Sequence, residues 1–200
     1  MYNIGAAVGL KNVYIAIITE DNDGYETYGT PEYFAPVMNV SMNIDFAEGK
    51  LSADDITYAQ DKIFNGGTIT AGFANIKATM LAKVLGAKID DNGIVVHSAE
   101  DYKNAPFVAF GFEAPHSTGK SRFEWFYRVK FSTPNESYQT KGDSVNYSTP
   151  SLEGKIFAKN KPISNGDHPW HAVCLEGESE SSAATIAAWF NAVPEPSFTP

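Results

Sequence analysis

The residues best suited to chemistry gather in one short segment near the carboxyl end of the chain. Asp167, His168 and His171 lie close together, and imidazole and carboxylate groups can bind zinc or transfer protons. Pro169 between the two histidines argues against a helix, and in a strand side chains three positions apart face opposite ways. We therefore expect no metal site here.

The remaining candidates for catalysis are equally weak. Cys174 is the only cysteine, which excludes an internal disulfide and any multi-cysteine metal site. Its neighbours Trp170, Ala172 and Val173 predict a small core residue. A Gly-x-Ser-x-Gly elbow, a phosphate-binding glycine loop and a dinucleotide fingerprint are absent from the sequence. We expect no catalytic residue, no cofactor and no enzymatic activity.

The charge of the chain argues against binding to nucleic acid. The net charge is −9, with nine acidic and two basic side chains in the first 60 residues, and 15 acidic and 13 basic ones afterwards. A protein that holds phosphates carries the opposite excess. The sequence also shows neither a signal peptide nor a membrane-spanning segment, so we expect a soluble protein made in a reducing cytoplasm.

Alternating apolar and polar residues predict a β-rich fold. Residues 38–46 alternate without a break, and residues 123–131 repeat the pattern with Phe126 as the one apolar exception, which is typical of strands with one wet face. Further strands are expected at 13–19, 68–74, 107–112, 152–158 and 170–176, and the strands at 107–112 and 123–131 should form a hairpin. Helices are expected after Asn75 and after Ser182 as N-caps, and the first should stop at Gly86. We expect a single domain over residues 1–193 and a flexible tail over residues 194–200.

The long interval 47–67 is the first functional candidate. Connections of this length are uncommon inside a compact domain, and this one carries too many apolar residues for an inert linker. It could cover an edge of its own sheet or contact a neighbouring subunit, and the sequence favours neither option. The candidate contact residues of this arm are Leu51, Ile56, Tyr58, Ile63 and Phe64.

The order of short segments along almost the whole chain is similar to that of the major tail protein family of siphophages, of the phi13 type. The matching segments are Gly9-Leu10-Lys11-Asn12-Val13-Tyr14, Tyr28-Gly29-Thr30-Pro31, Asn65-Gly66-Gly67-Thr68, Leu85-Gly86-Ala87, Lys141-Gly142-Asp143-Ser144, Asn160-Lys161-Pro162, His168-Pro169-Trp170 and Trp189-Phe190. Their order, more than any single segment, carries the resemblance.

This resemblance implies a tail tube protein of the virion, assembled in the host cytoplasm. The implied fold is mainly β, a β-sandwich or partial barrel with one flanking helix and a C-terminal helix. The implied partners are copies of the chain itself, in stacked hexameric rings, and other tail proteins: the tape measure, tail terminator and distal tail proteins. DNA would pass through the lumen of the tube without specific binding.

A polar strand face would then line the water-filled lumen. The candidate lumen-facing residues are Asn39, Ser41, Asn43 and Asp45. A wall without a positive surplus would release DNA, since lysine and arginine contacts to phosphate create strong binding.

The alternative is a monomeric β-sandwich module that binds a ligand such as a carbohydrate. Its stacking candidates are Tyr25, Tyr28, Tyr33 and Trp170.

Overall fold

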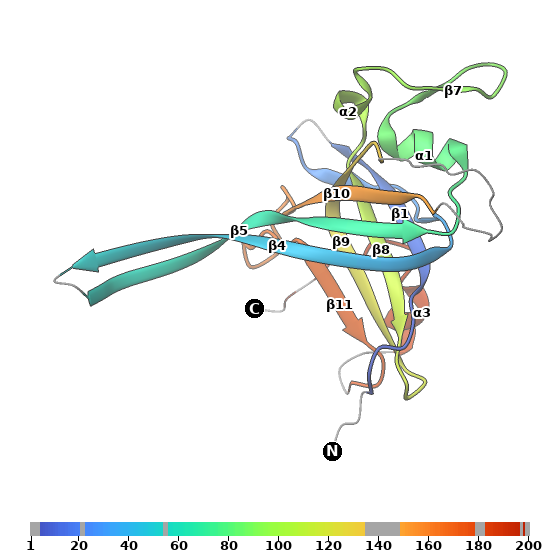
Figure 1. The fold of residues 1–200 in the computed structure, drawn as a ribbon. Helices are drawn as coiled ribbons and strands as arrows, with labels where there is room; N and C mark the ends of the chain where they lie inside the picture. Colours follow the sequence, from blue (N-terminus) through green and yellow to red (C-terminus); the bar gives the residue numbers. More distant parts are fainter. Residues whose placement is uncertain are drawn as a thin grey trace, which may run out of the picture.

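The computed structural model describes residues 5–20, 23–53, 56–134, 149–178, 183–196 and 198, and the side chains of these except for residues 51–53 and 56–59. The fold is mainly β, as the sequence predicts, and is built on a nine-stranded antiparallel sheet that does not close into a barrel. Its main path runs β2-β1-β8-β9-β10-β5-β4, with β11 paired to β9 and β3 paired to β1. Figure 1 shows this body with one long hairpin reaching away from it.

The bounds of the elements are as follows. The strands are β1 (Lys11–Glu20), β2 (Glu26–Tyr28), β3 (Glu32–Tyr33), β4 (Val37–Ala53), β5 (Ile56–Phe73), β6 (Lys88–Ile89), β7 (Val95–Val96), β8 (Val108–Pro115), β9 (Ser121–Ser132), β10 (Ser151–Phe157) and β11 (His171–Leu175), and the helices are α1 (Ala78–Leu85), α2 (Asp101–Asn104) and α3 (Ala183–Ala188). Every predicted strand is present, and the hairpin between 107–112 and 123–131 is confirmed as β8 and β9. None of the described helices is long and apolar enough to cross a membrane.

The central strands β1, β8 and β9 separate two hydrophobic clusters. The first cluster is built on Val13, Ile15, Phe34, Ile69, Phe73, Val84, Leu85, Val108, Phe110, Phe112, Phe126, Val129, Phe131, Leu152 and Ile156. The second, smaller cluster is built on Ala16, Ala109, Phe123, Trp125, Tyr127, Trp189 and Val193. Both faces of the central strands are therefore covered, one by α1, β5 and β10 and the other by the segment that contains and follows α3.

β9 contains a register shift, and its side chains are less exposed than its alternation predicts. Between the pairs Val108↔Val129 and Phe110↔Phe126, β9 carries one residue more than β8, which is a β-bulge. Before the bulge Phe126 faces the first cluster, and beyond it Val129 does so. The bulge exchanges the two faces of the strand, so the odd-numbered residues face the second cluster before it and the first cluster beyond it. Trp125 and Phe126 are both fully buried because a cluster covers each face of β9.

The predicted helix after residue 75 is α1, with a corrected start. Its C-terminal stop is confirmed, because Gly86 adopts the left-handed conformation (φ 75°) and donates its N–H to the carbonyl of Ala82. Its predicted N-cap is wrong, since Lys77 rather than Asn75 occupies that position and makes no side-chain cap. α3 confirms the second predicted helix, while its proposed cap Ser182 lies outside the described residues.

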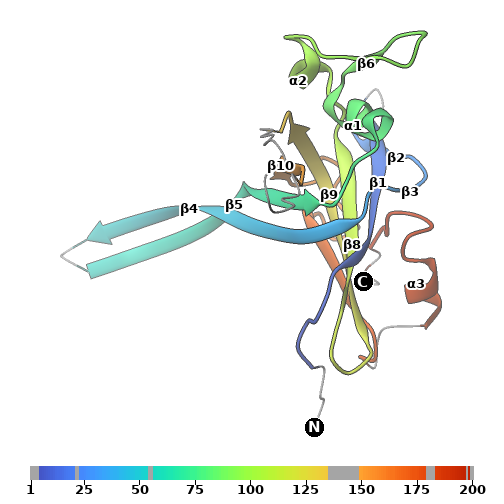
Figure 2. The same ribbon diagram turned by 45° about the vertical axis from the view of Figure 1, so that its right-hand side comes forward.

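The interval 47–67 is not a loop. It is the outer part of β4 and β5, which pair from Val37↔Phe73 out to Ala53↔Ile56 as one long antiparallel hairpin. Views that differ by 45° both show it projecting from the side of the body (Figures 1 and 2).

Candidate assembly surface

The outer part of the hairpin lacks the support that its inner part has. β10 pairs with β5 only as far as the pair Ile156↔Gly67, while β4 continues to pair with β5 beyond it. Residues 46–53 and 56–64, here called the shaft, thus form a two-stranded ribbon with no third strand among the described residues. At about 3.3 Å per residue, each shaft strand extends roughly 25 Å.

A bulge at Gly66 marks the point where the shaft leaves the sheet. Between Ile44↔Gly67 and Phe46↔Phe64, β5 carries one residue more than β4. Gly66 has φ 104°, a backbone conformation that side chains with a Cβ rarely adopt, and a Cβ there would lie 3.1 Å from the carbonyl oxygen of Ile156. Bulges bend a strand and increase its twist, so this glycine helps to set the direction of the shaft.

Aromatic stacking fixes the base of the shaft. The Phe64 ring stacks on Trp170 with centroids 5.2 Å apart and an interplanar angle of 8°, and the Phe46 ring meets Phe64 edge-on at 6.3 Å. Trp170 stacks in turn on His171, which stacks on the buried Phe126. The shaft is therefore anchored through a ladder of rings that ends in the first cluster.

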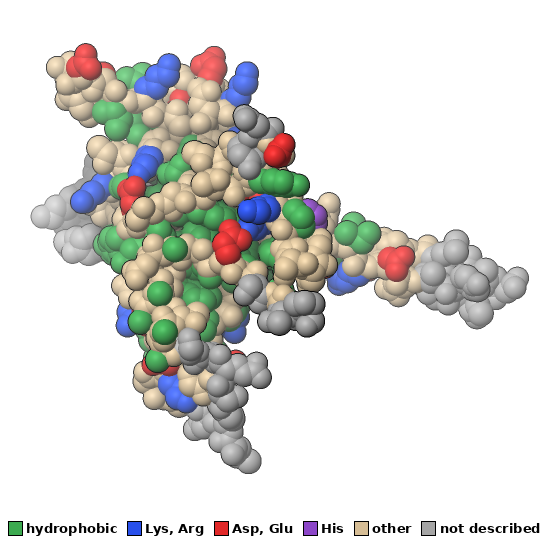
Figure 3. Space-filling model, turned by 180° about the vertical axis from the view of Figure 1, so that it is seen from behind, with side chains coloured by type: hydrophobic (Ala, Val, Ile, Leu, Met, Phe, Trp, Pro, Cys, Tyr) green, Lys and Arg blue, Asp and Glu red, His purple; other side chains and the backbone are tan. Residues whose placement is uncertain are grey.

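Beyond this base, the shaft exposes both apolar and charged side chains. Ile63 is 67% exposed, and Asp61, two positions before it on the same face, is also exposed. On the opposite face Lys62 forms an ion pair with Glu48 at 3.0 Å and lies 4.9 Å from the Phe46 ring centroid. The space-filling view shows the described part of the shaft standing clear of the body (Figure 3).

The predicted arm residues fall on this shaft. Leu51 pairs with Ala59 and Ile56 with Ala53, and Tyr58 belongs to β5, but the side chains of these three lie outside the described residues. Ile63 points into solvent, whereas Phe64 is held by its own chain. The assignment of these residues to a subunit contact stays a prediction.

β4 is also the free edge of the sheet. Among the described residues it pairs with β5 alone, so its other side presents a row of backbone N–H and C=O groups. Its core-facing side is only partly covered, because Val40 and Ile44 pack against the first cluster while Met38, Met42 and Phe46 remain 55%, 42% and 45% exposed. An edge of this length with exposed apolar residues is a template for pairing with another chain.

The predicted lumen residues share one polar face. Asn39, Ser41, Asn43 and Asp45 are all exposed on β4, and Asn43 donates a hydrogen bond to Asp45 at 3.1 Å. The face continues through Thr68 and Thr70 of β5, Glu153 and Lys155 of β10, and Lys130 and Ser132 of β9. This face thus carries two carboxylates, Asp45 on β4 and Glu153 on β10, and two ammonium groups, Lys130 and Lys155.

The histidine pair does not form a site. His168 Nδ1 lies 2.8 Å from the carbonyl oxygen of Lys159, while His171 Nε2 lies 3.0 Å from Oε2 of Glu124. Among the described residues no cluster of histidine, cysteine and carboxylate side chains could hold a metal ion. Cys174 is half-buried and packs against the second cluster, so it is less buried than the small core residue that the sequence predicts.

Glu124 was missed by the sequence reasoning because its alternating strand predicts an exposed side chain. It is 5% exposed and accepts hydrogen bonds from Arg122 Nε at 2.6 Å and from His171. Burial acts to raise the pKa of this carboxyl group, but the hydrogen bonds from His171 and Arg122 outweigh it and hold the pKa below its ordinary value. The group is therefore an ionised carboxylate in a structural ion pair.

A second buried charge fastens the C-terminal segment to the body. The Lys159 ammonium group, 1% exposed, pairs with Glu195 at 2.6 Å and lies 5.4 and 5.5 Å from the ring centroids of Tyr28 and Tyr127. Tyr127 donates its hydroxyl hydrogen to the carbonyl oxygen of Pro194 at 3.0 Å. Burial raises the pKa of both tyrosine hydroxyls, so both stay protonated. These contacts hold Pro194 and Glu195 against the body. The flexible tail over residues 194–200 stays a prediction.

The aromatic residues of the alternative binding module do not form an open platform. Trp170 is stacked between Phe64 and His171, and Tyr28 lies against Tyr127. Tyr33 is half exposed and packs edge-on against Tyr14. Stacking on a sugar needs a free ring face, so the geometry does not favour this alternative.

Comparisons with known proteins give only distant likenesses. No protein-family model and no curated protein matches the chain. One similar solved structure is described as the cap of the anti-feeding prophage, a tube-terminating cap, with a TM-score of 0.40, 9% identity, and coverage of 87% of this chain and 96% of that one. Another is a chain of the anti-feeding prophage baseplate, with a TM-score of 0.37, 5% identity, and coverage of 84% and 97%.

Proposed function

We propose that this chain is a structural subunit of a phage tail tube and that its biochemical activity is binding to copies of itself. The subunits form hexameric rings that stack into the conduit for DNA, and the other tail proteins meet the tube at its ends and in its lumen. The observation that carries this proposal is the solvated shaft beside a free sheet edge. The order of sequence segments, similar to the siphophage major tail proteins, supports it.

The shaft is difficult to explain in a protein that works alone. A two-stranded hairpin is marginally stable in water, since it buries little apolar surface for the backbone entropy that it loses. Here it also keeps Ile63 in solvent. Contact with a second copy would cover the ribbon and supply the missing packing.

The free edge at β4 would set how neighbouring subunits are arranged. Backbone pairing along β4 joins the sheet of one copy to an element of the next and removes the exposed edge from both. Repeating the same contact around a rotation axis closes a ring. The exposed side chains of Met38, Met42 and Phe46 would be covered by the same neighbour.

The polar face of β4 is then available to line a lumen. Amide, hydroxyl and carboxylate groups at Asn39, Ser41, Asn43 and Asp45 bind water well and carry no positive charge that would hold phosphate strongly. DNA passes such a wall without being held. The subunit transforms no substrate.

Negative-stain microscopy of the concentrated, purified chain tests the proposal. Rings or hollow tubes are expected. A matched control removes residues 48–62 and joins Ala47 to Ile63 through Asn-Gly, which leaves the pairing of β5 with β10 intact. This control should stay folded and dispersed. A parent chain that remains monomeric at every concentration would contradict the proposal.

A further inference from the structure

Two lysines face each other on the outer surface of the sheet without an acidic partner. Lys130 of β9 and Lys155 of β10 are directly opposite in the register. Lys155 donates a hydrogen bond to Thr68 Oγ1 at 2.7 Å, and Lys130 lies over the rings of Tyr102 and Phe107 at 5.0 and 5.2 Å. Neither forms an ion pair with any described residue of its own chain.

This arrangement is unfavourable in the isolated subunit. Like charges directly across two strands repel each other, and the rings near Lys130 offset only part of that repulsion. Phe157, next to Lys155 on the same face of β10, is 38% exposed. The surface therefore presents a pair of cations beside an exposed aromatic ring. A partner surface with an acidic side chain next to an apolar side chain would be complementary to it.

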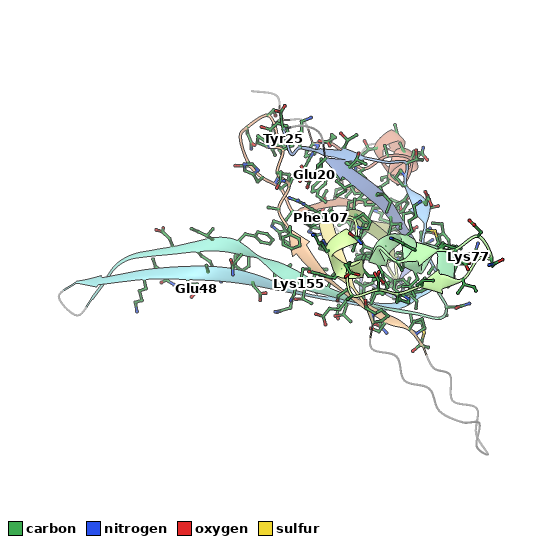
Figure 4. The ribbon with its side chains drawn as sticks, turned by 90° about the horizontal axis from the view of Figure 1, so that it is seen from above. Glu20, Tyr25, Glu48, Lys77, Phe107 and Lys155 are labelled. Atoms are coloured by element: carbon green, nitrogen blue, oxygen red, sulfur yellow. The ribbon has the colours of Figure 1, made fainter. Side chains whose placement is uncertain are left out.

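The shaft carries that complementary pair. Asp61 and Ile63 are two positions apart on β5, so they face the same way about 7 Å apart, and both are exposed. Lys155 and Phe157 have the same spacing on β10. Neither strand of the shaft can fold back onto this surface of its own chain, because the shaft projects away from the body while Lys155 and Phe107 lie on the body itself (Figure 4).

We infer that the shaft of one copy docks on the β9–β10 surface of a second copy, with Asp61 against Lys155 and Lys130, and Ile63 against Phe157. This inference rests on the proposed function and names its contact. It also has a consequence for the bore. The docked Asp61 offsets part of the positive charge that the two lysines place on the same face as Asn43 and Asp45.

Charge exchange between two variants tests the contact. Asp61→Lys and Lys155→Glu should each raise the concentration needed for self-association by about tenfold or more, since each sets like charges against each other. A one-to-one mixture of the two variants restores opposite charges at positions 61 and 155 in each contact between unlike variants, so it should associate within about threefold of the parent chain. The double variant D61K/K155E should do the same alone.

The controls separate docking from folding. Lys155→Glu replaces a repulsive cross-strand pair with an attractive one, so its monomer should melt no lower than the parent while its association is lost. Asp91→Lys, at the turn between β6 and β7, changes charge by the same amount away from the contact and should associate normally.

The outcomes distinguish this contact from others. Normal association of both single variants, or failure of the mixture to recover, would overturn the docking contact while leaving a tube-forming subunit intact. Retention of the parent on a heparin column, lost in Lys155→Glu, would assign the lysines to a polyanion and would also overturn it. A parent chain that never associates would refute the proposed function and this contact together.

Discussion

The glycine at the base of the shaft allows a sharp test of how the hairpin is held. Gly66 has φ 104°, and an added Cβ would lie 3.1 Å from the carbonyl oxygen of Ile156. Gly66→Ala therefore combines a strained backbone conformation, which costs of order 1–3 kcal/mol, with a close contact to a carbonyl that belongs to the sheet. We expect the free energy of unfolding to fall by about 2–3 kcal/mol. For a domain of this size, the melting temperature should fall by roughly 5–10 °C.

Gly49 provides the matched control on the same hairpin. It lies in β4 opposite Asp61, its backbone is outside the left-handed region, and no atom lies within 4 Å of an added Cβ. Gly49→Ala should leave the free energy of unfolding unchanged or raise it by up to about 0.5 kcal/mol, because alanine loses less backbone entropy on folding. Urea denaturation followed by tryptophan fluorescence measures both variants. Equal stabilities for the two variants would refute the assignment of a bulge to Gly66.

Three further predictions concern the described charges and the shaft. Glu124 has a folded-state pKa below its unfolded value of about 4.3, so its contribution to stability is present above that value and is lost as the pH falls through the folded pKa. When the free energy of unfolding is measured between about pH 6 and 3, Glu124→Gln should therefore lose less stability toward acid than the parent chain does. Glu195→Gln leaves the buried Lys159 charge without its ion-pair partner and should lower the free energy of unfolding by about 1–2 kcal/mol in urea titrations, whereas unchanged stability would show that Lys159 is satisfied by its two tyrosine rings. Ile56→Asp should abolish association in sedimentation-velocity runs without lowering the melting temperature, and normal association would remove the outer shaft from the interface.

The body of the fold was largely predictable because its strands lie beside a core. The apolar run at 107–112 and the alternation at Leu152, Gly154 and Ile156 are imposed by neighbours on one or both faces. Gly86 could be identified as a helix stop because few residues other than glycine adopt its left-handed conformation.

The shaft could not be identified as a pair of strands for the opposite reason. Both faces of its described part meet solvent in the isolated chain, so no core imposes an alternation of apolar and polar residues there. The bulge at Gly66 and the register shift between Leu51 and Ser52 also change which face a residue occupies. What remained visible was an interval with too many apolar residues for a linker.

Buried charges were missed because their partners are distant in the sequence. Lys159 finds Glu195 at the C-terminal end, and Glu124 finds His171. Nothing local to either residue distinguishes it from an exposed charge on a strand or turn. The pair of Lys130 and Lys155 likewise depends on the register between β9 and β10, which the sequence alone did not determine.

Backbone hydrogen exchange tests the central claim most directly. The amides of residues 37–50 on the free edge and of residues 60–64 on the shaft are to be compared between dilute and concentrated samples of the parent chain. Pairing of β4 with a second copy predicts slower exchange in both segments at high concentration, with the buried amides of β9 unchanged. Equal exchange of these segments at every concentration would contradict an edge and a shaft made for binding another copy.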